Sequence, residues 1–355
     1  MKKFLKAFIS KKFITIVCCL SILLTLSGCT KSTSNDSKSE TSTKTLTDMG
    51  NRTVTLPTEV NKISVIHPIP CQMVWRLAPN KLVSINNQFT QRIEFMSAEE
   101  QKKLLALPVN GGFDDLNNED LLAVNPDVVV SLTKDTKVED RQSAVNIPYY
   151  VVSKDTLSDI ANSWRSIGKL VGNEKEGNEI GDYWDETVKK VTDQTSKIPD
   201  SKKLKVYYAQ SDVVSTVGSK TIMSSIIKSA GGISFMNSNP ALDKNNETSE
   251  GIKLSMEQIY AWNPDVIITQ TKAGSDEIMS SSAWKDINAV KNKRVYPSTK
   301  YAMLDRTQSL MGLLWTTEKL YPGTLGIDVN SEIRKFYSKV YLDDNVTDEQ
   351  LNATM

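Results

Sequence analysis

One segment of this 355-residue chain occurs twice, and this repetition limits the folds that the chain can adopt. Residues 119–134 read EDLLAVNPDVVVSLTK, and residues 257–272 read EQIYAWNPDVIITQTK. A polar residue, Asn117 or Ser255, precedes each copy as a helix cap, and the proline of the NPD triplet ends the helix. The short β-branched run that follows is typical of a buried strand. Two copies of one helix–turn–strand unit predict two similar lobes.

Length and element order support the same architecture. The chain exceeds the roughly 250–300 residues that one core usually serves, so two domains are expected. A hairpin is predicted at residues 47–57, strands at 62–66, 82–85, 128–130, 148–152, 204–210, 266–269 and 294–296, and helices at 73–77, 99–105, 221–229, 283–287 and 309–320. Strands that alternate with helices predict an α/β fold with mostly parallel sheets. Residues 157–198 predict two helices divided at Gly172, the second about 22 residues long and able to join the lobes.

The beginning of the chain reads as a targeting segment. Lysines precede an apolar run at residues 14–26 that is shorter than a membrane span. The run ends in LSGC, which resembles a bacterial lipobox, so we expect residues 1–28 to be a lipoprotein signal peptide and Cys29 to carry a lipid. A plain secretory signal or an uncleaved anchor is the alternative. Residues 29–45 are rich in Ser, Thr and Lys, and we expect a disordered tether there.

Composition and missing motifs exclude several functions. A net charge of +1 gives no sign of nucleic-acid binding. His67 is the single histidine, which excludes sites that need two or three imidazole ligands. The sequence lacks a G-x-S-x-G elbow, an H-E-x-x-H motif and a Walker loop. We therefore expect no catalytic residues and no metal site of the protein's own; the alternative, a tethered extracellular hydrolase, would have to use His67.

Motifs along the whole mature chain together resemble a solute-binding lipoprotein of an ABC importer, of the type that carries iron–siderophore, haem, cobalamin or oxyanion cargo. The resemblance is carried by the lipobox and by residues 47–57, 111–130, 254–268, 283–297 and 304–322. It implies two α/β lobes joined by one long interdomain helix, with a ligand cleft between the lobes. The expected division is a signal peptide at 1–28, a tether at 29–45, an N-terminal lobe at 46–155, a helical linker at 156–200, a C-terminal lobe at 201–342 and a frayed polar tail at 343–355.

The resemblance also implies two docking residues. Glu119 and Glu257 begin the two copies of the repeat, and in the family a glutamate at this place on each lobe binds arginines of the membrane permease. A carboxylate and a guanidinium pair in a bidentate, directional way that suits docking. The alternative is that each acid only complements a helix N-terminus.

Ligand-binding residues are expected where strands end, because ligands of open parallel sheets lie beyond the C-terminal ends of the strands. The candidates are His67, Cys71, Met73, Asn86, Gly112, Phe113, Tyr208, Gln210, Tyr301, Asp305 and Arg306. His67 could instead be a plain loop residue, and Cys71 a small buried hydrophobe. Asp305 and Arg306 could bind anionic cargo near a helix N-terminus or only fix their loop.

The expected cargo is an iron complex, a ferric siderophore-type chelate, because this group is the commonest in the family. Molybdate or tungstate, haem and cobalamin are the alternatives. The expected partners are the permease subunits and, through them, an ATPase. We further expect a monomer that binds no nucleic acid, has no cofactor besides its cargo, and is held outside the cytoplasm by the lipid on Cys29.

Overall fold

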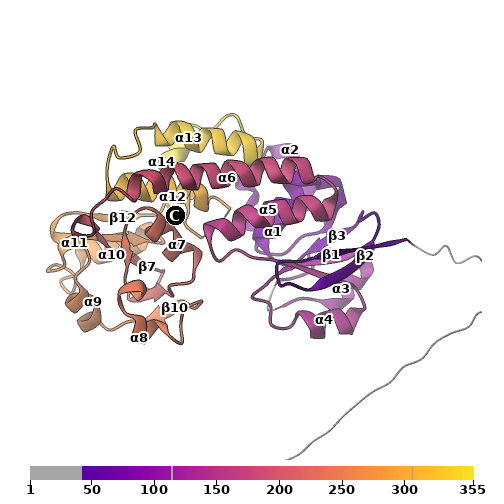
Figure 1. Ribbon diagram of the computed structural model, residues 1–355, viewed down its shortest axis with the longest axis horizontal. Coiled ribbons are helices and arrows are strands. Elements are labelled where there is room, and N and C mark those ends of the chain that lie inside the picture. Colours follow the sequence, from indigo (N-terminus) through magenta and orange to yellow (C-terminus); the bar gives the residue numbers. More distant parts are fainter. Residues whose placement is uncertain (1–41, 113–114, 306) are drawn as a thin grey trace, which may run out of the picture. The chain divides into compact units, whose positions relative to one another are not determined.

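The computed structural model describes residues 42–112, 115–305 and 307–355, all of which belong to one compact unit. Two four-stranded parallel sheets lie in this unit, one in each lobe, and helices flank them (Figure 1). The predicted two-lobed α/β fold is confirmed. No helix among the residues described is both long enough and apolar enough to span a bilayer.

The two sheets have the same topology. The N-terminal lobe contains β3 (Ile63–Val65), β4 (Leu82–Ser84), β5 (Val128–Leu132) and β6 (Tyr149–Val152), and the C-terminal lobe contains β7 (Lys205–Ala209), β9 (Ile233–Ser234), β11 (Val266–Thr269) and β12 (Val295–Pro297). Their spatial orders are β4-β3-β5-β6 and β9-β7-β11-β12. Numbered along the chain within each lobe, both read 2-1-3-4. The similarity that the repeat predicts therefore extends to the arrangement of every strand.

The repeated segments form equivalent helices in front of the third strand of each sheet. These are α3 (Asn118–Val124) and α9 (Met256–Trp262). At Ser255 the capping box is complete, because the Ser255 side chain accepts the N–H of Gln258 and the Gln258 side chain accepts the N–H of Ser255. The Asn117 side chain accepts N–H groups of the first turn of α3 without this reciprocal bond. Each helix ends at the asparagine of NPD, which adopts the left-handed conformation that caps helix C-termini.

The aspartate of each NPD triplet fixes the neighbouring first strand. Asp127 Oδ2 accepts the N–H of Lys62 at 2.9 Å, and Asp265 Oδ2 accepts the N–H of Lys205 at 3.0 Å. Backbone bonds run the other way, from Asp127 N–H to Lys62 O and from Asp265 N–H to Lys205 O. One residue type in the repeat thus aligns β3 with β5 and β7 with β11.

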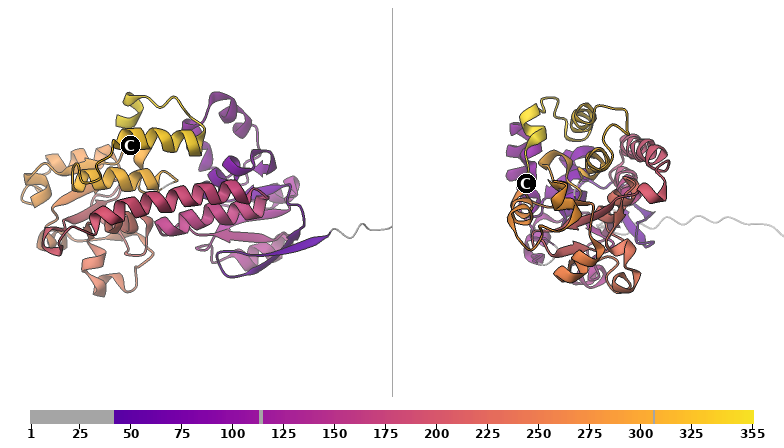
Figure 2. Two further views of the ribbon diagram at one scale, coloured as in Figure 1. Left: turned by 45° about the horizontal axis from the view of Figure 1, so that its top comes forward. Right: turned by 90° about the vertical axis from the view of Figure 1, so that its left-hand side faces the viewer.

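Two long helices connect the lobes. α5 (Leu157–Val171) and α6 (Glu174–Thr195) lie side by side (Figures 1 and 2), and α6 has the 22 residues that its sequence predicts. Gly172, with φ of 78°, ends α5 and permits the turn into α6. α5 packs on α1 (Pro68–Leu77) of the N-terminal lobe, and α6 packs on α7 (Ile222–Ser229) and α12 (Ser309–Leu320) of the C-terminal lobe.

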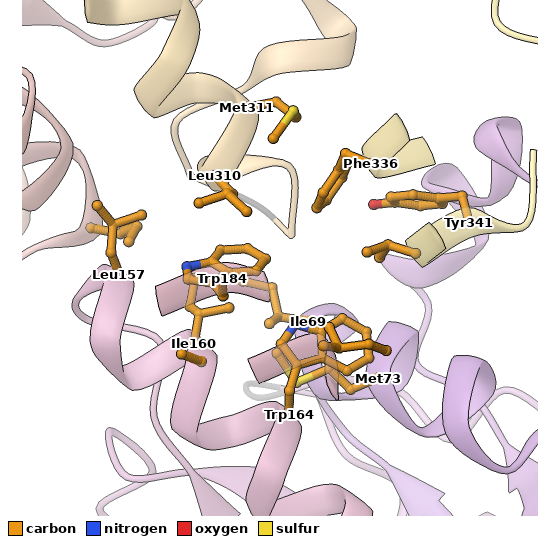
Figure 3. Close-up of a cluster of buried hydrophobic side chains, with 14 of the residues drawn as sticks. Ile69, Met73, Leu157, Ile160, Trp164, Trp184, Leu310, Met311, Phe336 and Tyr341 are labelled. Atoms are coloured by element: carbon orange, nitrogen blue, oxygen red, sulfur yellow. The ribbon is translucent and has the colours of Figure 1, made fainter. Parts of the chain in front are cut away.

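One apolar cluster runs through both lobes along these helices (Figure 3). Trp164 of α5 and Trp184 of α6 are fully buried at its centre. Met73 of α1 belongs to the same cluster, as do Leu310 and Met311 of α12. Burying large aromatic side chains supplies much of the stability of a core, so this shared cluster ties the lobes together, while each lobe also has an apolar cluster of its own.

The remaining elements are β1 (Thr43–Thr47), β2 (Thr53–Pro57), α2 (Ala98–Leu105), α4 (Val138–Val145), β8 (Ser215–Val217), α8 (Pro240–Asp243), β10 (Glu250–Lys253), α10 (Lys272–Ser280), α11 (Asn288–Lys291), α13 (Val329–Phe336), a π-helical turn (Tyr337–Tyr341), α14 (Asp348–Asn352) and 3₁₀ turns at Pro79–Lys81, Phe89–Gln91, Ile93–Phe95, Asp200–Lys202, Met236–Ser238 and Lys300–Ala302. β1 and β2 form the predicted hairpin, but β1 begins at Thr43, inside the segment expected to be a tether.

Three further features of the structure differ from the predictions. α1 begins at Pro68, where a loop was expected, because prolines are compatible with a first helical turn whose N–H groups need no partner. The helix predicted at residues 283–287 is wrong, since α10 and α11 lie on either side of turns there. The C-terminal tail is not frayed: Leu351 of α14 is buried, and Met355 O accepts the N–H of Lys272 at 2.6 Å.

The α5–α6 contact depends on two glycines. A Cβ on Gly177 would lie 2.7 Å from Trp164 O and 2.8 Å from Gly168 Cα, closer than folded proteins allow. We therefore expect Gly177→Ala to lower the free energy of unfolding by about 1–3 kcal/mol, although alanine favours helix more than glycine does. Thermal unfolding followed by circular dichroism measures this.

The matched control for that substitution is Gly181→Ala on the same helix. There the three atoms nearest to the added Cβ, at 2.8–2.9 Å, all belong to the side chain of Arg165 and not to backbone. Equal melting temperatures for the two variants would contradict the role given to the glycine contact.

Candidate functional site

Three side chains that can be positively charged follow strands of the N-terminal sheet. His67 comes after β3, Lys134 after β5 and Lys154 after β6. Leu132 and Val152 are paired across β5 and β6, so the two lysines lie two residues beyond adjacent strand ends. In a 2-1-3-4 sheet the connections diverge between the first and third strands, here β3 and β5, and such a switch point opens a crevice for ligands.

His67 caps α1 and is neutral at pH 7. Its Nδ1 accepts the N–H of Ile69 at 3.2 Å, which leaves the proton of the neutral ring on Nε2. Burial lowers the pKa of His67 well below its usual 6.5, and the charges of Lys154, Arg92 and Lys134 lower it further. The positive charges of these three side chains therefore favour the neutral imidazole.

A carboxylate from the C-terminal lobe reaches the same lysines. Glu250 Oε1 lies 3.2 Å from Lys154 Nζ and 3.4 Å from Lys134 Nζ, and Lys134 Nζ also lies 2.9 Å from Asp155 Oδ1. Partial burial raises the pKa of Glu250, but Lys154 and Lys134 outweigh it and hold the pKa below its usual value. The Glu250 carboxylate thus joins the lobes at the mouth of the crevice.

Glu250 stands at an irregularity of its strand. The β8–β10 pairing shifts register between Glu250 and Ile252, and Gly251 between them has φ of 108°, a conformation that other residues rarely adopt. Bulges of this kind re-aim side chains. The side chain of Gln210, a predicted ligand residue that follows β7, lies beside Gly251 and so borders the same ribbon.

A small cavity adjoins the cationic group. It has a volume of about 10 Å³ and is lined by Pro68, Ile69, Gln72, Phe89, Arg92, Thr307, Gln308 and Tyr341, which come from both lobes. Gln72 is 3% exposed, and its Nε2 has no hydrogen-bond partner among the residues described. A buried N–H without an acceptor is unfavourable, so this amide is placed to donate to an oxygen atom that enters the cavity.

An aromatic group closes the other side of the cleft. Phe95 of the N-terminal lobe packs edge-on against Tyr301 at 5.0 Å between ring centroids, and Tyr301 lies 4.7 Å from Tyr337. Burial raises the pKa of Tyr301 to about 12. Lys300 and Glu94 pair across the lobes nearby at 3.2 Å. Tyr301, a predicted ligand residue, is thus committed to an interlobe contact in this conformation.

Other predicted ligand residues serve the fold. Cys71 and Met73 are fully buried in α1, so neither faces the cleft as expected, and burial raises the pKa of the Cys71 thiol far above its usual value. Asn86 is buried and its Oδ1 accepts the N–H of Phe89 at 2.9 Å. Tyr208 is buried in the core. In each case packing against the sheet explains the residue.

Of the remaining predicted residues, Gly112 and Asp305 lie in described loops. The Gly112 N–H donates to Asp115 Oδ1 at 2.7 Å, and Asp305 is half-buried in the loop before α12. Cys29, Phe113 and Arg306 lie outside the residues that the structure describes.

The lysines and Glu250 were not predicted. Lys134 is the last residue of the first repeat copy, whereas its counterpart Lys272 pairs with Asp276 on α10 at 2.6 Å. Ligands lie beyond the C-terminal ends of parallel strands. The residues that follow β5 and β6 are therefore also candidates, and they include Lys134 and Lys154. Glu250 has no comparable signal, because its partners are 96 and 116 residues away in the chain.

A more open cavity of about 1000 Å³ lies between the start of α5, the end of α6 and α7. Hydroxyl groups and Lys203, Lys220 and Lys228 line it. Of the residues described, none of the cations around His67 lines this cavity. Within the same residues there is no group of three or more His, Cys, Asp or Glu side chains that could hold a metal ion. We therefore place the candidate site in the cleft.

The two sheets meet through their strand-end loops, and Glu250 of one lobe pairs with Lys134 and Lys154 of the other. A family model described as periplasmic binding protein matches residues 88–302, more than half of the chain, and the protein belongs to this family. With its relatives, this makes it an extracytoplasmic solute-binding protein of an ABC importer.

Individual relatives agree with this assignment. The molybdate-binding protein MolA of Haemophilus influenzae is 24% identical over 83% of this chain and 90% of its own length. An ABC transporter substrate-binding lipoprotein of Bacillus subtilis, YvrC, is 23% identical over 84% and 94%. The structure of Haemophilus influenzae MolA bound to molybdate superposes with a TM-score of 0.73 at 22% identity, covering 86% of this chain and all of the other, which supports the fold.

The buried neutral His67 predicts how stability depends on pH. Its pKa is lower in the folded protein than the 6.5 of the unfolded chain, so the unfolded state binds the proton more readily. The contribution of His67 to the free energy of unfolding should therefore be fully present above pH 6.5 and should be lost as the pH drops below that value. His67→Asn, which keeps an acceptor at the helix cap, should remove this loss between pH 7 and pH 5.

Melting temperatures of the two proteins across that range provide the test. Because the chain has one histidine, no other imidazole contributes. Parallel curves for wild type and His67→Asn would show that this imidazole is not held neutral by the fold.

Proposed function

We propose that the cleft of this solute-binding protein captures an anionic cargo, and that a small oxyanion of the molybdate type fits it best. The observation that carries the proposal is that Lys134 and Lys154, which follow adjacent strands of the N-terminal sheet, lie 3.4 and 3.2 Å from the same carboxylate oxygen of Glu250. Neighbouring cations in a partly desolvated crevice favour an anion. The relatives are solute-binding proteins, and we propose binding without turnover.

Neutral donors add to these charges. The Gln72 amide has a free N–H, and Thr307 and Gln308 line the same small cavity with Arg92. Pro68 and Pro70 remove two N–H groups from the first turn of α1, and Ile69 gives its N–H to His67. Recognition in this part of the cleft therefore depends on side chains rather than on the start of α1.

Size favours a small ion over a large chelate. The cavity of about 10 Å³ that Arg92 borders, which neither Lys134 nor Lys154 lines, holds roughly one water-sized group, whereas drug-sized ligands occupy about 300–1,000 Å³. An oxyanion needs a modest adjustment of the cleft, and a siderophore needs the lobes to separate. That the relative MolA is named for binding molybdate supports the same choice. The ferric siderophore-type chelate expected from the sequence stays a prediction; if anionic, it would use the same lysines.

Removing either lysine should weaken binding of molybdate. A charge-assisted hydrogen bond contributes about 1.5–3 kcal/mol, so Lys134→Ala and Lys154→Ala should each raise the dissociation constant about tenfold or more. Isothermal titration calorimetry at fixed ionic strength measures the change.

The repeat supplies the control for this experiment. Lys272 occupies the position of Lys134 in the second copy but pairs with Asp276, so Lys272→Ala should bind as wild type does. An equal loss in all three variants, or none, would overturn the lysine assignment. If wild type binds cobalamin or a neutral ferric chelate but no oxyanion, the proposed cargo is wrong.

We also propose that Glu119 and Glu257 dock this protein on its permease. Both lie in the first turns of equivalent helices, α3 and α9, and are exposed. Neither helix contains a lysine or arginine that could neutralise them. One turn later each helix exposes an apolar residue, Leu122 at 50% and Tyr260 at 38%. Two matched acidic and apolar patches fit a partner that offers two matched basic sites.

Reversing both charges tests the docking role. Glu119→Lys combined with Glu257→Lys should abolish uptake by cells and leave cargo affinity unchanged, because the cleft is not altered. The control is Glu179→Lys with Glu186→Lys, which reverses two exposed acids on α6. Loss of cargo affinity in the first pair, or equal loss of uptake in both, would contradict docking through α3 and α9.

We propose that Cys29 carries the lipid that holds the protein at the membrane, as expected from its lipobox. The Bacillus subtilis relative named a lipoprotein supports this assignment. Mass spectrometry of the N-terminal peptide from membrane fractions would identify the modification.

A further inference from the structure

The carboxylate of Glu250 lies where an anionic cargo would bind. Lys134 and Lys154 together carry two positive charges, and Asp155 and Glu250 together carry two negative charges. The lysine pair is therefore compensated in this structure. An anion that reaches the pair gains its full attraction only after one carboxylate has left.

Of the two carboxylates, Glu250 can move away from the lysines more easily. Its contacts of 3.2 and 3.4 Å use a single oxygen and exceed the roughly 2.7–2.9 Å of strong charge-assisted bonds. Asp155 Oδ1 lies closer to Lys134, at 2.9 Å, as an ion pair without hydrogen-bond geometry. The Glu250 side chain is 42% exposed. It is carried by a bulged two-stranded ribbon beside Gly251, whereas Asp155 immediately precedes α5 in the rigid linker.

We infer that Glu250 is an internal competitor, which occupies the Lys134–Lys154 pair until an anionic cargo displaces it and thereby sets the affinity and selectivity of the cleft. This inference rests on the proposed anionic cargo. A multivalent oxyanion can accept hydrogen bonds from both lysines at once through different oxygens, which Glu250 does not do here. Weakly binding monovalent anions gain too little to displace the carboxylate, so the competitor discriminates against them.

The test compares Glu250→Gln with wild type, using sodium molybdate and sodium chloride as probes in calorimetric titrations. The glutamine keeps the size of the side chain and removes its charge. Since an exposed ion pair contributes up to about 1 kcal/mol, two weak contacts predict molybdate affinity about three- to tenfold higher in the variant. Chloride should compete with molybdate measurably in the variant and much less in wild type.

The matched control is Glu247→Gln, three residues earlier. Glu247 is 41% exposed and pairs with Lys220 at 2.7 Å, so its loss changes the net charge equally without touching the lysine pair. Molybdate affinity of this variant should equal that of wild type.

A second readout does not depend on the affinity values. Without cargo, Glu250→Gln leaves Asp155 to compensate one of the two lysine charges, so its melting temperature should fall and molybdate should raise it by more than it raises that of wild type. Glu247→Gln should show the wild-type increment.

The results of these titrations distinguish the competitor role of Glu250 from a net-charge effect and from a wrong choice of cargo. If wild type binds molybdate and Glu250→Gln binds it equally or more weakly, the competitor role is overturned and Glu250 only closes the cleft. If Glu247→Gln tightens binding as much as Glu250→Gln, the effect belongs to net charge and the inference fails. If no variant binds any anion, the proposed cargo fails, and this inference fails with it.

Discussion

The close packing of α5 on α6 supports the rest of this structure. Gly168 and Gly177 let the two helices approach, and Trp164 and Trp184 fill the space that they share with α1 and α12. Because this apolar cluster belongs to both lobes, the lobes cannot each move as independent domains without exposing it. Adjustment on ligand binding is therefore expected in the loops and ribbons at the strand ends, where the polar contacts between the lobes are.

Those polar contacts are weaker than the apolar ones, and this difference suits a binding protein. The Glu250–Lys154 and Lys300–Glu94 pairs are both longer than strong charge-assisted bonds, and both are partly exposed. Water and salt can replace them at small energetic expense. A cleft held by such contacts can open for cargo, while the shared core keeps the strand ends facing each other.

Sequence reasoning succeeded where the information is local. The repeat predicted the shared topology because capping residues, the NPD turn and the apolar strand act within about fifteen residues of one another, and the Asp127 and Asp265 side chains then fix the neighbouring strand. The length of α6 followed from apolar spacing alone.

Prediction from the sequence failed where contacts join residues that are far apart in the chain. Cys71 and Met73 follow a strand, as a ligand residue would, but α1 turns both into the core. Met355, which follows the polar helix α14, forms backbone bonds with Ser298 and Lys272, which no local pattern reveals. The cleft depends on Glu250 meeting lysines about a hundred residues away, and such pairings arise only from the complete fold.

The most direct test of the central claim is crystallographic. Crystals grown with sodium tungstate, a heavy analogue of molybdate, would locate the bound anion by anomalous scattering. If cargo displaces Glu250, we expect one strong peak within hydrogen-bond distance of the Lys134 and Lys154 Nζ atoms, with the Glu250 carboxylate moved away from both. A fully occupied tungstate elsewhere, with Glu250 still on the lysines, would contradict it.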